Sequence, residues 1–187
     1  MKAKYSYLLL IVLFFCSCGS EAPVESEFER LKSAHLNIAT TLEFTFIPDF
    51  TLTQITCSPP EAKILLPAKQ WIRGTFDYFE GIDETRSYVL NKSCEAVDAT
   101  HLKELFEGFI IDKSNNSITF SGWVIVDAEN ATANTLMPVN GEIQVTEGAG
   151  KFKGVSGSVR MNGNISYLNG LMEWKGEGFI AFKNIPD

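Results

Sequence analysis

Histidine, serine and aspartate in the right arrangement could make this chain a hydrolase. The two histidines, His35 and His101, lie far apart in the sequence. No Gly-x-Ser-x-Gly nucleophile motif accompanies them, because the most similar stretch, residues 154–158, ends in serine. We therefore expect both histidines at the surface, and we predict no catalytic residue. Whether the protein is an enzyme stays open, with a non-enzyme favoured.

Carboxylates near residue 80 are the second group that could do chemistry. Acidic oxygens bind calcium, and paired carboxylates can act as general acid and base. The acidic group here lacks the Asp-x-Asp-x-Asp-Gly spacing of a calcium loop, so a solvated loop is the simpler interpretation; its members are Asp77, Glu80, Asp83 and Glu84. We predict neither a metal site nor a cofactor.

The chain has four cysteines, two in its N-terminal segment and two farther along. Cys57 and Cys94 are an even pair, which in an oxidising compartment indicates a disulfide. No His or Cys lies at metal-ligand spacing near them, and thiol redox pairs are usually close in sequence. We predict a structural Cys57–Cys94 disulfide, with two unpaired buried thiols as the alternative.

Glycine is concentrated in residues 148–157, which read Gly-Ala-Gly-Lys-Phe-Lys-Gly-Val-Ser-Gly. Neither the dinucleotide fingerprint nor the P-loop spacing is present. Because the stretch lies between two predicted strands, it predicts a bulged turn in which glycines take positive φ or crowd another backbone. We expect Phe152 to point into the core, and the glycines that shape the turn to be Gly148, Gly150, Gly154 and Gly157.

In this position the stretch resembles the Gly-x-Gly-x-Phe-x-Gly-x-x-Gly turn of allene-oxide-cyclase-like and dirigent-like barrels. The later residues 174–178, Trp-Lys-Gly-Glu-Gly, fit the last strand of such proteins. The resemblance covers about residues 70–183. It implies a closed antiparallel barrel in which the turn links two late strands. It also implies a cyclase or isomerase activity on an apolar molecule as one possible function, although no catalytic residue of the family can be matched.

The elements that must position these residues read mostly as strands. Alternating apolar and polar residues predict seven strands, with an eighth at 88–90, and the seven are 42–46, 71–80, 106–112, 117–127, 139–147, 158–165 and 171–183. Residues 113–116 predict a hairpin connection, and residues 98–105 predict one short helix capped by Asp98. We predict an all-β fold, a single small antiparallel β-barrel of about eight strands. A lipocalin-like barrel and a β-sandwich are the alternatives.

Aromatic side chains are numerous, and several lie on the predicted strands. In a closed barrel about half of them point inward, where they either fill the core or line a pocket for an apolar small molecule. Core filling is the interpretation we favour, because a small barrel has little spare volume. The residues that would line such a pocket are Trp71, Tyr78, Phe120, Trp123 and Trp174.

The N-terminus has the pattern of a secretory signal peptide. Two lysines precede an unbroken apolar run over residues 7–16, which is too short to span a bilayer. The run ends in Phe-Cys-Ser-Cys-Gly-Ser and resembles the lipobox of bacterial lipoproteins. We favour Cys18 as the lipidated residue, because small Ser17 precedes it; Cys16 is the alternative, but bulky Phe15 precedes that residue.

This resemblance implies a signal peptide over residues 1–17, a lipidated cysteine with an acidic tether over 18–35, and the barrel over 36–187. It implies that several acyl chains anchor the protein to a bacterial membrane, and we favour the outer membrane. The domain would face the periplasm or the exterior.

Charge and length limit the function further. The 187-residue chain carries a net charge of −7, which excludes a general nucleic-acid binder, and its 45% hydrophobic content excludes gross disorder. A binding or structural role in the cell envelope is the function we favour, with an apolar small molecule as a possible ligand. An isomerase-like enzyme and a subunit of an envelope complex are the alternatives. A homo-oligomer is possible.

Overall fold

The structure is a computed structural model that describes residues 30–31, 37–52, 54–57, 65–129, 132 and 135–182. The predicted signal peptide, both candidate lipidation sites (Cys16 and Cys18), His35 and nearly all of the predicted tether lie outside the described residues.

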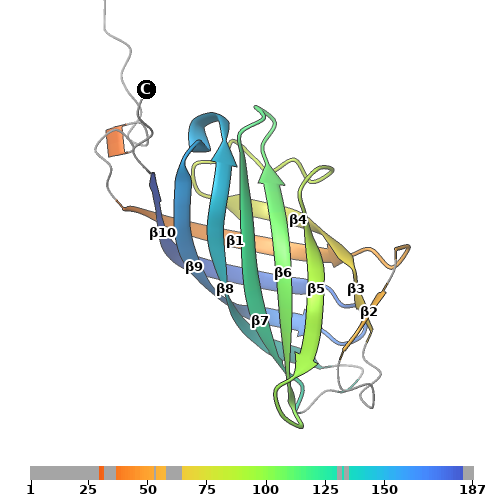
Figure 1. The fold of residues 1–187 in the computed structure, drawn as a ribbon. Coiled ribbons are helices and arrows are strands. Elements are labelled where there is room, and N and C mark those ends of the chain that lie inside the picture. Colours follow the sequence, from red (N-terminus) through yellow and green to blue (C-terminus); the bar gives the residue numbers. More distant parts are fainter. Residues whose placement is uncertain are drawn as a thin grey trace, which may run out of the picture.

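Eight antiparallel strands close into a barrel in the order β1-β10-β9-β8-β7-β6-β5-β4 (Figure 1). The remaining two strands, β2 and β3, form a small separate sheet. This confirms the predicted all-β barrel. The strands are β1 (Ile38–Pro48), β2 (Gln54–Thr56), β3 (Leu65–Pro67), β4 (Lys69–Phe76), β5 (Tyr88–Ala96), β6 (His101–Ile111), β7 (Ser117–Asp127), β8 (Leu136–Ala149), β9 (Val155–Ser166) and β10 (Met172–Phe182).

Strand β1 closes the ring because it pairs with β10 on one side and with β4 on the other. The seams differ greatly in length. Strands β6 and β7 pair along their whole length, from His101 opposite Asp127 to Ile111 opposite Ser117. In contrast, β4 and β5 pair only through residues 69–71 and 88–90. The β4–β5 seam is therefore the shortest pairing in the ring.

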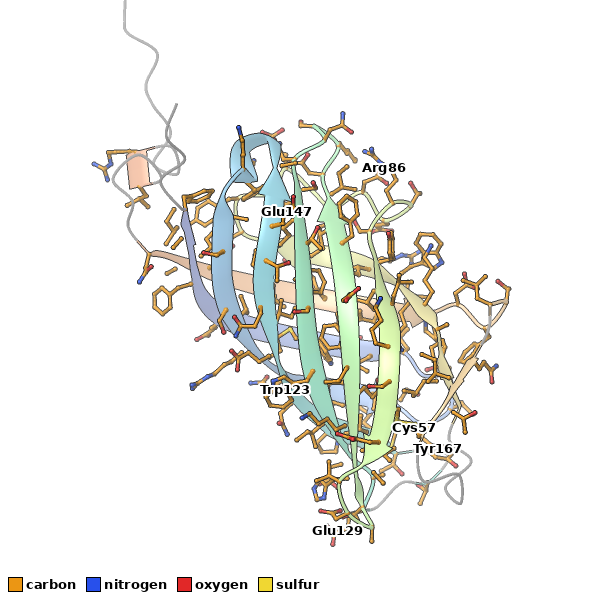
Figure 2. All side chains as sticks on the ribbon, viewed as in Figure 1. Cys57, Arg86, Trp123, Glu129, Glu147 and Tyr167 are labelled. Carbon is orange, nitrogen blue, oxygen red and sulfur yellow. A yellow bond between two sulfur atoms is a disulfide. The ribbon has the colours of Figure 1, made fainter. Side chains whose placement is uncertain are left out.

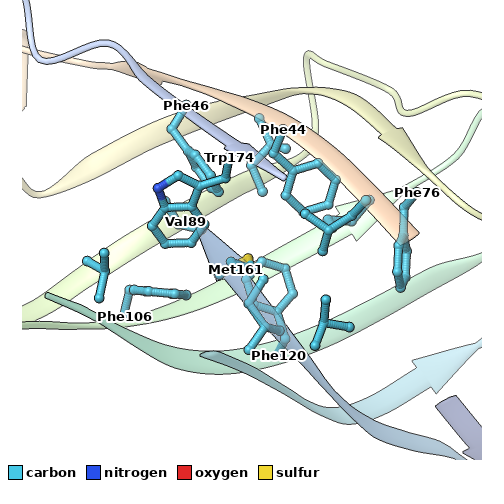
Figure 3. Packing of buried hydrophobic residues seen from close by; sticks show 14 of the residues in the cluster. Phe44, Phe46, Phe76, Val89, Phe106, Phe120, Met161 and Trp174 are labelled. Carbon is cyan, nitrogen blue, oxygen red and sulfur yellow. The ribbon is translucent and has the colours of Figure 1, made fainter. Parts of the chain in front are cut away.

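The interior of the barrel is packed with apolar side chains. Every second residue of the strands is buried, as the period-two geometry of a strand requires. Figure 3 shows aromatic rings in contact inside the barrel: Phe46 and Trp174, on the neighbouring strands β1 and β10, have ring centroids 4.7 Å apart, and the Phe106 ring of β6 lies 5.6 Å from that of Trp174. Such edge-on contacts between large rings fill the centre of a small barrel efficiently.

Two glycines make room for this aromatic core. Gly108 of β6 lies opposite Phe120 of β7, and Gly122 of β7 lies opposite Phe106 of β6. A Cβ atom on Gly108 would come within 2.0 Å of the Phe120 ring, and one on Gly122 within 2.6 Å of the Phe106 ring. Each ring thus occupies the space above the glycine on the neighbouring strand.

The predicted helix over residues 98–105 is wrong. Residues from His101 onward belong to β6, and Leu105 is 41% exposed on the outer face. Asp98 does cap a turn, but of a different kind: its Oδ1 accepts the backbone N–H groups of Thr100 (2.8 Å) and His101 (2.9 Å) in the β5–β6 connection. Pairing with both β5 and β7 outweighs the local helical pattern.

The predicted turn between two strands at residues 148–157 is confirmed, but the pairing of β8 with β9 has no bulge. A 3₁₀ turn, Gly150–Phe152, links β8 to β9, and Gly150 and Gly154 have φ of +64° and +80°. Phe152 is fully buried and stacks on Phe79, with ring centroids 4.4 Å apart. Gly148 and Gly157 are sites of close approach, where a Cβ would lie 2.4 and 2.2 Å from a backbone carbonyl oxygen.

The Cys57–Cys94 disulfide is confirmed, and it joins the segment after β2 to strand β5. The predicted hairpin connection at 113–116 is also confirmed, between β6 and β7. The connections fall into two sets at opposite ends of the barrel. We call the end with the start of β1 and the β8–β9 turn the tether end, and the end with the β9–β10 turn the apolar end. In Figure 2, Arg86 and Glu147 lie toward the former, and Glu129 and Tyr167 toward the latter.

Candidate functional site

The five aromatic residues predicted to line a pocket are divided between the two faces of the barrel wall. Phe120 and Trp174 are buried in the interior. Trp71 and Trp123 alternate with buried neighbours and lie half-buried on the outer face. Tyr78 follows β4, and its hydroxyl donates to the carbonyl of Ala39 at 3.1 Å.

Trp71 forms part of an outer cluster. Its indole N–H donates to Asp49 at 3.3 Å, and the Lys69 ammonium lies 3.5 Å from its ring centroid. The same ammonium lies 4.6 Å from the ring of Tyr88 on the neighbouring strand. These contacts occupy the indole N–H and the ring face of Trp71 on the outside of the barrel, so this residue does not border the interior.

The acidic group near residue 80 does not converge on one point. Asp77 accepts hydrogen bonds from the N–H and hydroxyl of Thr41, so it holds the end of β4 to β1. Asp83 accepts from Thr85 and Arg86, which lowers its pKa to about 2. Among the described residues, no group of three or more His, Cys, Asp or Glu side chains could hold a metal ion.

One carboxyl group lies inside the barrel. Glu104 of β6 points inward between Leu102 and Phe106 and is only 2% exposed. Burial raises its pKa to about 7, because no hydrogen bond or neighbouring charge among the described residues offsets the loss of water. Its cross-strand neighbour is Cys94, so the carboxyl lies next to the disulfide.

Two further residues with polar side chains line the same small cavity as Glu104, namely Gln70 and Trp174. Their Oε1 and Nε1 atoms are buried, and neither has a hydrogen-bond partner among the described residues. Asn91 also borders the cavity, but its amide donates to the Pro67 carbonyl at 2.8 Å. The cavity has a volume of about 10 Å³ and is otherwise walled by apolar side chains, chiefly Phe46, Phe106, Val124 and Met172.

Of Glu104, Gln70 and Trp174, only Trp174 is predicted from the sequence to line an interior site. Glu104 could have been found from the sequence, because Leu102, Glu104 and Phe106 occupy alternate positions of one strand. Assigning residues 98–105 to a helix hid this alternation. Gln70 gave a weaker signal, because it precedes the stretch that was predicted as a strand.

The outer wall also carries a broad concave surface of about 1000 Å³, formed by β8, β9, β10 and β1. Small residues such as Gly157 and Gly178 line its floor, and Phe179 stands 58% exposed beside them. It is wide and open to solvent, and we assign it no chemistry.

Exposed apolar side chains gather at the apolar end. Leu168 is 75% exposed and Leu136 62%, and they lie in or beside connections that touch one another. The backbone N–H of Tyr167 donates to the Thr135 carbonyl, and Phe50 lies beside Gly170. Among the described residues, the large exposed apolar side chains at this end are those of Phe50, Leu52, Val97, Leu136, Tyr167 and Leu168.

Acidic residues accompany this patch. Asp49, Asp98, Asp127 and Glu129 all lie in the connections of the apolar end or at a strand terminus beside them. Lys69, the nearest base on β4, lies over the ring of Trp71. The apolar end therefore presents exposed leucine and aromatic side chains within an acidic surrounding.

Comparison of the chain with protein-family models, with curated proteins and with solved structures finds no match to any of them. The resemblance to allene-oxide-cyclase-like and dirigent-like barrels stays a prediction. Among the described residues, no helix is long and apolar enough to cross a membrane.

Proposed function

We propose that the protein is an exported lipoprotein, anchored to a bacterial membrane through Cys18, whose closed barrel docks another envelope protein. The observation that carries this proposal is the exposed apolar patch at the apolar end, which includes Leu136, Tyr167 and Leu168. Contiguous apolar surface within a polar rim is typical of protein interaction sites.

The filled interior supports docking over binding of an apolar small molecule. Ligand pockets commonly enclose about 300–1,000 Å³. The cavity at Glu104 has about 10 Å³, which is space for one water-sized group. An isomerase-like function would need a substrate space that the packed rings of Phe46, Phe106 and Trp174 occupy instead.

The charge around the patch specifies the partner further. Asp49, Asp98, Asp127 and Glu129 would repel an acidic surface and attract a basic one. The partner that fits is an envelope protein with an apolar surface edged by Lys or Arg.

Site-specific photo-crosslinking in cells tests this function. A benzophenone amino acid at Leu168 should give one discrete adduct with a second envelope protein. The matched control is Lys175, which is well exposed on the outer wall of β10 and should give none. Adding Leu136→Asp should abolish the Leu168 adduct, because a charge would enter the apolar contact.

Three results would contradict the proposal. These are equal adducts from both positions, no adduct at Leu168, or an adduct of twice the chain mass, which indicates self-association instead.

A further inference from the structure

Three polar groups from three strands converge on the cavity inside the barrel. Glu104 comes from β6, Gln70 from β4 and Trp174 from β10, and all border the same space of about 10 Å³. Glu104 is 2% exposed, Gln70 4% and Trp174 3%. Buried polar groups in proteins are nearly always hydrogen-bonded, so this concentration of unsatisfied groups indicates a built site.

The hydrogen-bonding pattern selects the chemistry of the occupant. Gln70 Oε1 needs a donor and the indole N–H of Trp174 needs an acceptor, while Glu104 accepts when ionised and can also donate when protonated. A cation offers no acceptor to Trp174. An anion would face Gln70 Oε1 and Glu104, which repel it. An apolar group satisfies none of the three. A hydroxyl group both donates and accepts, so it alone matches the set.

Size leads to the same choice. A cavity of about 10 Å³ holds the centre of one water-sized group and no more. The surrounding walls of Phe46, Phe106, Val124 and Met172 offer no competing hydrogen bond. The side-chain amide of Asn91 already donates a hydrogen bond to the Pro67 carbonyl.

We propose that Glu104, Gln70 and Trp174 form an interior binding site for a single water molecule. The water oxygen accepts the Trp174 indole N–H, and its protons are donated to Gln70 and Glu104. This site is separate from the apolar patch, so it stands whether or not the docking function holds.

Nuclear magnetic resonance of the full chain in detergent tests the site, with methanol as a probe of its size. The indole proton of Trp174, assigned by Trp174→Phe, should show a rotating-frame Overhauser peak to water, with the sign that distinguishes contact from chemical exchange. Titrated methanol should leave this peak unchanged, because the cavity has no room for a methyl group beside a hydroxyl. Trp71, whose indole N–H is bonded to Asp49, serves as the internal reference.

A water peak that methanol leaves unchanged supports the proposal, whereas a peak to the methanol methyl group would overturn it. Glu104→Leu should abolish the water peak because it fills the cavity and removes the acceptor. Glu104→Gln should retain it, which controls for folding.

Absence of the water peak in the unaltered chain would overturn the proposal. Persistence of the peak in a folded Glu104→Leu variant would overturn it as well.

Discussion

A single ionisable side chain, Glu104, makes the stability of the barrel depend on pH. Its pKa in the folded protein is about 7, against an ordinary value of 4.5, because burial disfavours the charged form. Between these values the folded state holds a proton that the unfolded state has lost. The free energy of unfolding therefore falls as the pH rises from about 4.5 to about 7, and this contribution is constant above that range.

Replacing Glu104 with Gln should remove this fall. The folded protein then no longer has to bury a charge above pH 7, so the variant should be more stable than the native chain at pH 8 by about 3 kcal/mol. Urea denaturation from pH 4 to pH 8 measures the effect. Glu107→Gln is the matched control, because Glu107 lies on the outer face of the same strand, paired with Lys92, and should leave the pH profile unchanged. A native chain with no loss of stability over this range contradicts the prediction.

Phe152 supports the tether end of the barrel. It is fully buried against Phe79, so Phe152→Ala should lower the free energy of unfolding by roughly 3–5 kcal/mol through lost burial and a cavity. Lys151→Ala, one residue away, should change it by about 0.5 kcal/mol or less, because the contact of Lys151 with Glu80 is a long surface ion pair. Thermal denaturation of both variants compares the two. Equal losses would show that the turn, and not the ring, carries the stabilisation.

At the scale of elements, the sequence predicted strands and turns well where local chemistry and long-range pairing agree. The turn at 148–157 is one such case, because Gly150 and Gly154 occupy positive φ values that few other residues adopt. The segment 98–105 shows the opposite. Its local pattern favours a helix, but hydrogen bonds to β5 and β7 decide its conformation, and no local signal reports those partners.

The candidate site was less predictable than the fold for the same reason. Glu104, Gln70 and Trp174 come from three strands, and only the closure of the ring brings them to one cavity. Burial of Trp174 follows from its alternating strand pattern. The inward direction of Glu104 depends on the register of β6, which the helical assignment concealed.

The disulfide stabilises the connection between the separate β2–β3 sheet and the barrel. On the chain-entropy model, a link across 37 residues contributes roughly 3–4 kcal/mol. A Cys57→Ala/Cys94→Ala double variant should lose about that much stability in urea denaturation without reductant. Reductant should destabilise the native chain and leave the double variant unaffected. A native chain that reductant does not destabilise would argue against the link.

For the whole molecule, the proposed lipid anchor would decide where the barrel works. Cys18→Ala should abolish acyl labelling and release the protein from the membrane, because the resemblance to a lipobox predicts that this cysteine is acylated. Cys16→Ala should leave labelling unchanged. Metabolic labelling with a radioactive fatty acid, followed by membrane fractionation, measures both. Labelling that survives in Cys18→Ala and is lost in Cys16→Ala would show that Cys16 is the acylated residue instead.

The short seam between β4 and β5 bears on how quickly the interior can be reached. It pairs through three residues on each strand, and two of them, Gln70 and Val89, also border the cavity at Glu104. At a short seam, small local openings are enough for the amide protons to exchange with solvent. The amide protons of the long β6–β7 ladder exchange only after larger openings. The barrel should thus open sideways at this seam before it opens at either end, and the lifetime of anything held beside Glu104 would be set by that lateral motion.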